Sequence, residues 1–130
     1  MARAAIVTGG TRGIGRAISV ALKDAGYSVA ATYAANDAAA ERFGEETGMT
    51  AFKWDVSDYD ACQTGAARVA EALGPVDVLV NNAGITRDGT IMGMSREDWQ
   101  TVVDTNLGSC FNMAKAVFPG MRERGFGRIV

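Results

Sequence analysis

Short runs of β-prone apolar residues that alternate with helical patterns constrain this chain more than any other feature of its sequence. The runs cover residues 4–8, 28–33, 50–54, 76–81 and 127–130, and each except the last is followed by a helical pattern. Strands that are apolar on both faces and joined by crossover helices form parallel sheets with helices on both sides. The alternation therefore predicts an α/β fold, a doubly wound parallel sheet.

The helical patterns and their end signals agree with this architecture. They cover residues 13–25, 37–47, 58–73 and a long stretch 95–124, in which Ser95 and Asp98 form a capping-box pair. A glycine stands just past each helix, where a left-handed residue commonly ends it: Gly26, Gly48, Gly74 and Gly125. A chain of 130 residues is long enough for one domain with one packed core.

The absence of histidine from the chain excludes several kinds of chemistry. Ser-His-Asp and Cys-His nucleophiles, HExxH metallohydrolases and His-containing zinc sites all require that residue. General acid–base catalysis must therefore use other side chains. Cys62 and Cys110 lie 48 positions apart without ligand spacing, so we expect two buried thiols and no metal site or disulfide.

The charge balance indicates which partners to expect. Thirteen basic and fifteen acidic residues give a net charge of −2, without the basic excess that nucleic acids or anionic membranes require. Neither an export signal nor a membrane-spanning run stands out in the sequence. We therefore expect a cytoplasmic protein with no nucleic-acid or membrane partner.

The segment TGGTRGIG, residues 8–15, falls where the first strand turns into the first helix. Glycines without a Cβ let the backbone approach a pyrophosphate, whose charge then meets the free N–H groups at the start of the helix. The alternative is a plain strand-to-helix turn. We expect a dinucleotide to contact the following residues of this turn: Gly9, Gly10, Thr11, Arg12, Gly13, Ile14 and Gly15.

The end of the second strand bears on which dinucleotide binds. NAD-selective sites place an acid there on the ribose hydroxyls, but no Asp or Glu lies between Asp24 and Asp37. Arg12 and Asn36 are instead placed to face a ribose phosphate, so we expect NADP(H), with a solvated loop charge as the alternative for Arg12. Asp37 lies only a few residues further on, and we expect it to act as a charge in the first turn of the next helix.

Asp55 and Val56 follow the third strand in the segment KWDVSD. The Asp55 carboxylate can accept a hydrogen bond from an adenine amino group, while Val56 supplies a backbone amide. A compatible alternative is that Asp55 or Ser57 caps the helix that begins near Asp58.

The fourth strand is followed by VNNAG, residues 80–84. Asparagine side chains at a strand end can hold neighbouring backbone, and small residues let a flat nucleoside lie close. We therefore expect Asn82, Ala83 and Gly84 to contact the cofactor, with a turn that binds no ligand as the alternative.

Together, TGGTRGIG and NNAG resemble the patterns TGxxxGIG and NNAG of the short-chain dehydrogenase/reductase family, and the resemblance spans the whole chain. It implies an extended Rossmann sheet, a nicotinamide cofactor and an Asn, Ser, Tyr, Lys tetrad in which the tyrosine is the acid and the lysine lowers its pKa. Asn106, in DTNLGS, matches the asparagine, which the resemblance assigns to a water-mediated proton relay. We expect Asn106 to be buried in the middle of a helix, with an asparagine on the helix surface as the alternative.

The other members of the tetrad have no counterpart here. None of the three tyrosines is followed four positions later by lysine. In the family the serine comes shortly after the strand beginning GRIV, which is where these residues stop. We therefore expect residues 1–130 to be the N-terminal part of a dinucleotide-binding Rossmann domain, truncated in the fifth strand and without the catalytic Ser/Tyr/Lys segment.

Within the family, segments such as NNAGITRDGT and GMRERGFGRIV look most like the reductases of 3-oxoacyl thioesters. The resemblance favours acetoacetyl-CoA reductases of polyhydroxyalkanoate synthesis over 3-oxoacyl-acyl-carrier-protein reductases of fatty acid synthesis. It implies a homotetramer and places Asp88 near the acyl thioester substrate, with a solvated turn charge as the alternative. Trp99, Met113 and Phe118 are expected in the core or a subunit interface.

Two functions of other classes remain open from the sequence. The chain could be a dinucleotide-binding module or fragment without catalysis, because it contains no acid with a suitable pKa. It could also be a structural subunit that uses the long helices at residues 58–73 and 95–124 as an oligomer interface.

Overall fold

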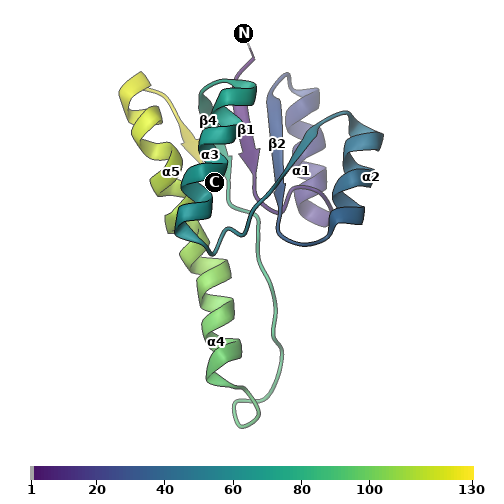
Figure 1. The fold of residues 1–130 in the computed structure, drawn as a ribbon, viewed down its shortest axis with the longest axis vertical. Coiled ribbons are helices and arrows are strands. Elements are labelled where there is room, and N and C mark those ends of the chain that lie inside the picture. The colour runs from purple at the N-terminus through teal and green to yellow at the C-terminus, as the bar shows by residue number, and fades with distance from the viewer. Residues whose placement is uncertain (1) are drawn as a thin grey trace.

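The computed structural model describes residues 2–130 and confirms the predicted α/β fold. One parallel sheet of five strands has the order β3-β2-β1-β4-β5 (Figure 1). The predicted ranges agree with the strands to within about a residue at either end. The strands are β1 (Ala4–Val7), β2 (Ser28–Tyr33), β3 (Thr50–Lys53), β4 (Val76–Val80) and β5 (Arg128–Ile129).

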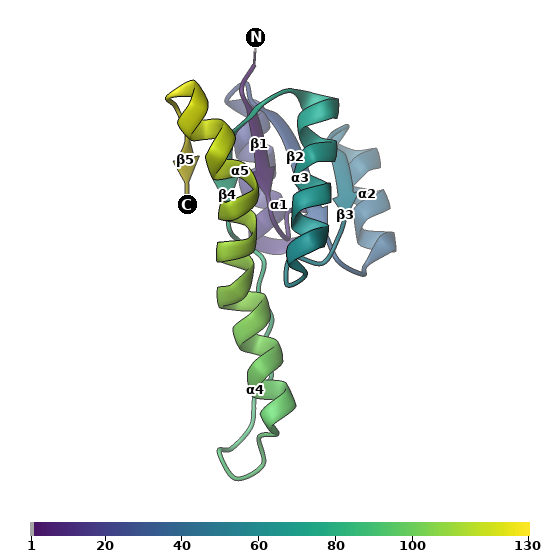
Figure 2. The same cartoon turned by 60° about the vertical axis from the view of Figure 1, so that its left-hand side comes forward.

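Helices cover both faces of the sheet (Figure 2). On one face, α1 and α2 pack with Val7, Val29 and Phe43 into one apolar core. On the other face, α3 and α5 enclose a second core around Leu79 and Met113. The helices are α1 (Gly13–Asp24), α2 (Asp37–Thr47), α3 (Tyr59–Leu73), α4 (Arg96–Val103) and α5 (Ser109–Arg124).

The prediction of one regular helix over residues 95–124 was wrong in its middle. A π-helical segment, η1 (Asp104–Gly108), separates α4 from α5. A π-helical turn adds one residue without breaking the helix. The spacing of apolar residues in the sequence does not reveal such a turn. The start of the helix was predicted correctly, because the Ser95 side chain accepts a hydrogen bond from the Asp98 N–H at 3.0 Å.

The predicted helix ends are confirmed. All four glycines that follow the helices have positive φ angles, a backbone conformation that residues with a Cβ rarely adopt. These residues are Gly26, Gly48, Gly74 and Gly125.

Residues 85–108, which we call the arm, extend beyond the lower end of the sheet (Figures 1 and 2). None of these residues is buried, and α4 and η1 contribute nothing to either core. Trp99 is 60% exposed on this arm, and Phe118 on α5 is 53% exposed. Of the three apolar residues expected in the core or an interface, only Met113 lies in the core.

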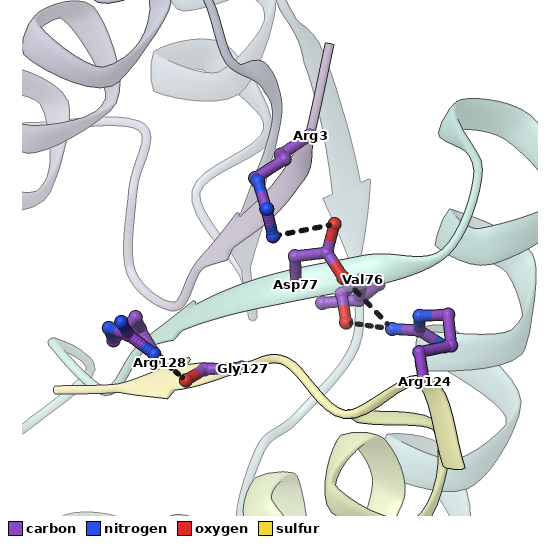
Figure 3. Close-up of polar contacts among 6 residues, drawn as sticks. All are labelled: Arg3, Val76, Asp77, Arg124, Gly127 and Arg128. Atoms are coloured by element: carbon purple, nitrogen blue, oxygen red, sulfur yellow. Dashed lines mark hydrogen bonds and ion pairs between the residues drawn. The ribbon is translucent and has the colours of Figure 1, made fainter. Parts of the chain in front are cut away.

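Ion pairs join the chain segments at the end of the sheet opposite the arm (Figure 3). Asp77 on β4 lies 3.7 Å from Arg3 and 3.2 Å from Arg124, measured between guanidinium nitrogen and carboxylate oxygen. The Arg124 guanidinium also donates to the Val76 carbonyl at 2.7 Å. These contacts fasten the end of α5 to β4. The candidate site lies at the opposite end of the sheet.

Two smaller expectations concern the cysteines and the membrane. Cys62 is buried as expected, whereas Cys110 is only half-buried because it lies on the partly exposed side of α5. Across residues 2–130, no helix combines the length and the apolar character needed to cross a lipid bilayer.

Candidate functional site

A cavity of about 730 Å³ opens at the carboxyl ends of the strands. It lies beside β1, where the order of the strands reverses between β2 and β4, which is where open α/β sheets bind ligands. It brings together twelve of the residues predicted from the sequence: Gly9, Thr11, Arg12, Gly13, Ile14, Gly15, Asn36, Asp55, Val56, Asn82, Ala83 and Gly84.

Further residues line this cavity that the sequence analysis did not assign to it. Most of them lie at or just after the ends of β2 and β3. Their position at the carboxyl edge of a parallel sheet could therefore have been predicted from the sequence. The sequence gives no such indication for Thr105, because this residue of η1 lies at the cavity only through the way the chain folds back after residues 85–103. The additional residues are Thr32, Tyr33, Ala34, Ala35, Trp54, Ile85 and Thr105.

Close packing of the glycine turn explains two of its glycines. A Cβ at Gly15 would lie 2.0 Å from the Gly9 carbonyl oxygen, so no other residue fits without moving backbone. A Cβ at Gly10 would lie 2.7 Å from the Val7 carbonyl oxygen and 2.8 Å from Ser19 Oγ. Gly10 does not line the cavity, and it packs the turn against the sheet beneath it.

Within residues 2–130, the start of α1 differs from the starts of α2, α3 and α4, while α5 continues directly from η1. The side chains of Asn36, Asp58 and Ser95 accept backbone N–H groups at the starts of α2, α3 and α4. At α1 the corresponding residue is Arg12, which provides no side-chain cap, and the first turn carries no acid. The backbone N–H groups at this end therefore remain free for an anion from outside the protein.

The Asn36 side chain has a structural partner as well as a place on the cavity wall. Its Oδ1 accepts the Ala39 N–H at 3.0 Å and caps α2, which leaves the amide Nδ2 for a ligand. Asp37 stands in the first turn of α2, as predicted. Its carboxylate pairs with Lys53 at 3.0 Å, and this hydrogen bond and charge lower the pKa of Asp37.

The predicted alternative for Asp55 and Ser57 was wrong, because neither residue caps α3. Asp58 does so, with its Oδ1 accepting the Ala61 N–H at 3.0 Å. Asp55 Oδ1 instead accepts two hydrogen bonds from Ser57, one from its N–H at 2.9 Å and one from its hydroxyl at 2.7 Å. This short turn holds the Asp55 carboxylate at the cavity.

Asn82 holds the backbone around it, as predicted. Its Nδ2 donates to the carbonyls of Thr8 at 3.1 Å and Gly9 at 3.2 Å. Thr8 returns the contact, since its hydroxyl oxygen accepts the N–H groups of Asn82 at 3.0 Å and Ala83 at 2.9 Å. The buried Thr8 was missed as a site residue, although it begins the TGxxxGIG pattern.

Asn106 lies in η1 and is exposed, so the expectation that it is buried was wrong. Its side chain makes two hydrogen bonds to Ile85: Oδ1 accepts the N–H at 2.8 Å and Nδ2 donates to the carbonyl at 2.9 Å. A Cβ at Gly84 would lie 3.3 Å from Asn106 Oδ1. Asn106 does not line the cavity itself, but it fastens the start of the arm beside it.

Asp88 is not brought to this cavity. It lies in the exposed loop of the arm between Ile85 and α4, and its place near a substrate stays a prediction. Within residues 2–130, no three His, Cys, Asp or Glu side chains are grouped closely enough to hold a metal ion.

Comparison with known proteins agrees with this site. The family model for short chain dehydrogenases matches residues 3–130. Acetoacetyl-CoA reductases of Paracoccus denitrificans and Rhizobium meliloti are each 60% identical over all 130 residues, which correspond to 54% of their own length. A 3-oxoacyl-[acyl-carrier-protein] reductase of Staphylococcus aureus is 41% identical over 135 residues, all of this chain and 55% of that protein.

The chain thus spans about half the length of the curated relatives it matches. Its strand order, its glycine turn and the placement of NNAG at the end of β4 fit the family whose model covers residues 3–130. The chain belongs to the short-chain dehydrogenase family.

Proposed function

We propose that the whole protein carrying this chain uses NADPH to reduce the 3-keto group of acetoacetyl-CoA to 3-hydroxybutyryl-CoA in the cytoplasm, within polyhydroxyalkanoate synthesis. The observation that carries the proposal is the cavity at the carboxyl ends of β1–β4, with its glycine turn and its uncapped helix. The choice of substrate is supported by the relatives named acetoacetyl-CoA reductase, at 60% identity.

The residues present fit a dinucleotide. The free N–H groups at the start of α1 suit a pyrophosphate, and beside them Gly13 lines the cavity with no heavy atom of the protein within 4 Å of where its Cβ would stand. Arg12 on the cavity wall and the free Nδ2 of Asn36 support a 2′-phosphate. Asp37 is paired with Lys53, so its negative charge is partly neutralised and opposes such a phosphate less.

Each part of the site has a proposed task. The α1 turn binds the pyrophosphate, Asp55 and Val56 bind the adenine, and Ala83 and Gly84 lie along the nicotinamide end. NADPH, when bound, supplies the hydride. Asn106 keeps one lone pair on Oδ1 after accepting the Ile85 N–H, and we assign it to the proton relay. The proton donor is assigned to a Ser/Tyr/Lys segment in the remainder of the protein.

The exposed apolar side chains of α4, η1 and α5 suit contacts between subunits of a homotetramer. Trp99, Leu107, Phe111 and Phe118 are each more than half exposed along this continuous helix. Tyr59 of α3 extends the surface, since its ring stacks on Phe111 with centroids 6.3 Å apart. Light scattering of the natural gene product checks this assembly, and Leu107→Glu is expected to reduce its mass.

The substrate is tested with the natural gene product and NADPH. Oxidation of NADPH is followed by its nicotinamide absorbance, with acetoacetyl-CoA or an acetoacetyl carrier protein as the acceptor. We expect a higher kcat/KM with the CoA thioester. Turnover only with the carrier protein would favour a 3-oxoacyl-[acyl-carrier-protein] reductase, which the 41% identical relative supports as the second candidate. Binding of NADPH without turnover of either acceptor would favour a non-catalytic module.

A further inference from the structure

Asn112 on α5 is a buried polar residue that the proposed reaction does not use. It is 8% exposed, and its Nδ2 donates to the Val56 carbonyl oxygen at 3.0 Å. The contact joins α5 to the loop after β3, across 56 positions of sequence. Because a carbonyl oxygen only accepts hydrogen bonds, the nitrogen of the Asn112 amide must face it.

The same peptide group continues this contact to the cavity. The Val56 carbonyl and the Ser57 N–H belong to one planar unit, so the direction of one sets the direction of the other. The Ser57 N–H donates to Asp55 Oδ1 at 2.9 Å, and the Ser57 hydroxyl donates to the same oxygen at 2.7 Å. Asn112 thus anchors one side of a peptide whose other side holds the Asp55 carboxylate.

Two groups next to this peptide remain open at the cavity. Within residues 2–130, neither Asp55 Oδ2 nor the Val56 N–H takes part in a hydrogen bond of the protein. Both residues line the cavity, so they offer a ligand one acceptor and one donor, the complement of the amino group and ring nitrogen of adenine. Rotation of the peptide between Val56 and Ser57 would turn the Ser57 N–H away from Asp55 Oδ1 and release the carboxylate from its place at the cavity.

A second contact to the Val56 carbonyl is weaker than that of Asn112. Cys62 Sγ lies 3.4 Å from the same oxygen. Burial raises the pKa of the Cys62 thiol to about 11, so it remains an S–H donor at neutral pH. A thiol is a poor donor beside an amide, and the Asn112 contact is therefore the main restraint on this carbonyl.

We propose that Asn112 is a positioning residue for nucleobase recognition, which holds the Val56–Ser57 peptide so that the Asp55 carboxylate faces an adenine ring. The proposal rests on the proposed dinucleotide cofactor. It ties the nucleobase end of the site to α5, the helix that continues from the segment carrying Asn106.

The test uses the natural gene product with Asn112→Leu, which removes the donor, and Asn112→Asp, which keeps the shape. Adenosine 2′,5′-bisphosphate probes the nucleobase half of the site, and reduced nicotinamide mononucleotide probes the other half, both by calorimetric titration. We expect adenosine bisphosphate to bind about threefold to tenfold more weakly, the range of one hydrogen bond, with nicotinamide mononucleotide unchanged. The KM for NADPH should rise while kcat at saturation stays the same.

Val117→Ala is the matched control, because Val117 is a buried residue of α5 in the apolar core. It should lower the melting temperature without changing either affinity. If Asn112 acts through Asp55, then adding Asn112→Leu to Asp55→Ala should weaken adenosine bisphosphate binding little further.

Three results would overturn the positioning role: unchanged adenosine bisphosphate affinity in both variants, an equal loss for both probes, or additive effects in the double variant. A protein that binds adenosine bisphosphate in an Asn112-dependent way but reduces no acyl thioester would refute the proposed reaction and leave the positioning role standing. A wild-type protein that binds no adenine nucleotide would overturn the positioning role together with the cofactor proposal.

Discussion

The arm, residues 85–108, and the remainder of the described chain are built in opposite ways. The sheet and its helices enclose two apolar cores, whereas no residue of the arm is buried. The two hydrogen bonds between Asn106 and Ile85 join the two ends of the arm to each other. Regions with few buried apolar contacts open at low free-energy cost, so the arm should be the less stable region.

The proposed tasks of binding and catalysis are also divided between the sheet region and the arm. The residues that line the cavity are mostly positioned by the core and its strand ends, while Asn106 and Asp88 lie on the arm. Cofactor binding should therefore follow from folding of the sheet. Catalysis should depend in addition on contacts that the arm makes outside these 130 residues or with other subunits.

The largest expected effect separates binding from chemistry. The isolated 130-residue chain should show no measurable NADPH oxidation with acetoacetyl-CoA, because hydride transfer needs a proton donor beside the carbonyl oxygen. The assay follows the nicotinamide absorbance before and after adding a polypeptide with the C-terminal half of the Paracoccus denitrificans relative. Activity of the isolated chain would refute the assignment of the acid to another segment.

The next effect concerns the arm. In the natural gene product, Asn106→Ala should lower kcat by about a hundredfold or more, the contribution typical of proton transfer. Cofactor affinity and melting temperature should change little, because the residue is exposed and outside both cores. Steady-state kinetics and thermal unfolding check this, and normal turnover would show that Asn106 only fastens the loop.

A pair of glycines compares the two regions directly. Gly15→Ala places a Cβ 2.0 Å from the Gly9 carbonyl oxygen, whereas Gly108→Ala in the arm meets no heavy atom closer than 3.8 Å. Gly15→Ala should cost about 1–3 kcal/mol of folding free energy and most of the NADPH affinity, since overpacking displaces backbone. Gly108→Ala should change neither. Denaturant unfolding and titration measure both, and equal effects would contradict the comparison.

The smallest effect tests the choice of cofactor. If Arg12 meets the 2′-phosphate through a charged hydrogen bond, Arg12→Ala should weaken NADPH binding roughly tenfold or more and NADH binding little. Arg87→Ala, an exposed arginine of the arm, should leave both affinities unchanged. Isothermal titration measures the four affinities. Equal binding of NADPH and NADH by the unaltered protein would remove the reason for choosing the phosphorylated cofactor.

Some features of the site were predictable because they depend on neighbouring residues. The glycines of the first turn and the asparagines after β4 stand at strand ends that apolar runs already indicate, and parallel strands bring those ends to one edge. The caps were less predictable. The pattern predicts a start of α3 near Asp58 with Asp55 or Ser57 as its cap, and it does not single out Asp58 as the cap because three polar residues in four positions all suit an N-cap.

By itself, the sequence determined the class of fold, the helix ends and most of the cavity wall, because periodicity, glycines and strand ends act over a few residues. Only the tertiary structure decided that Asn106 is exposed and bonded to Ile85, and that the long helix contains the π-helical segment η1. It also decided that Asn112 reaches the Val56 carbonyl. These contacts join segments 21 and 56 positions apart, and their geometry depends on how α5 packs on the sheet, which no local pattern records.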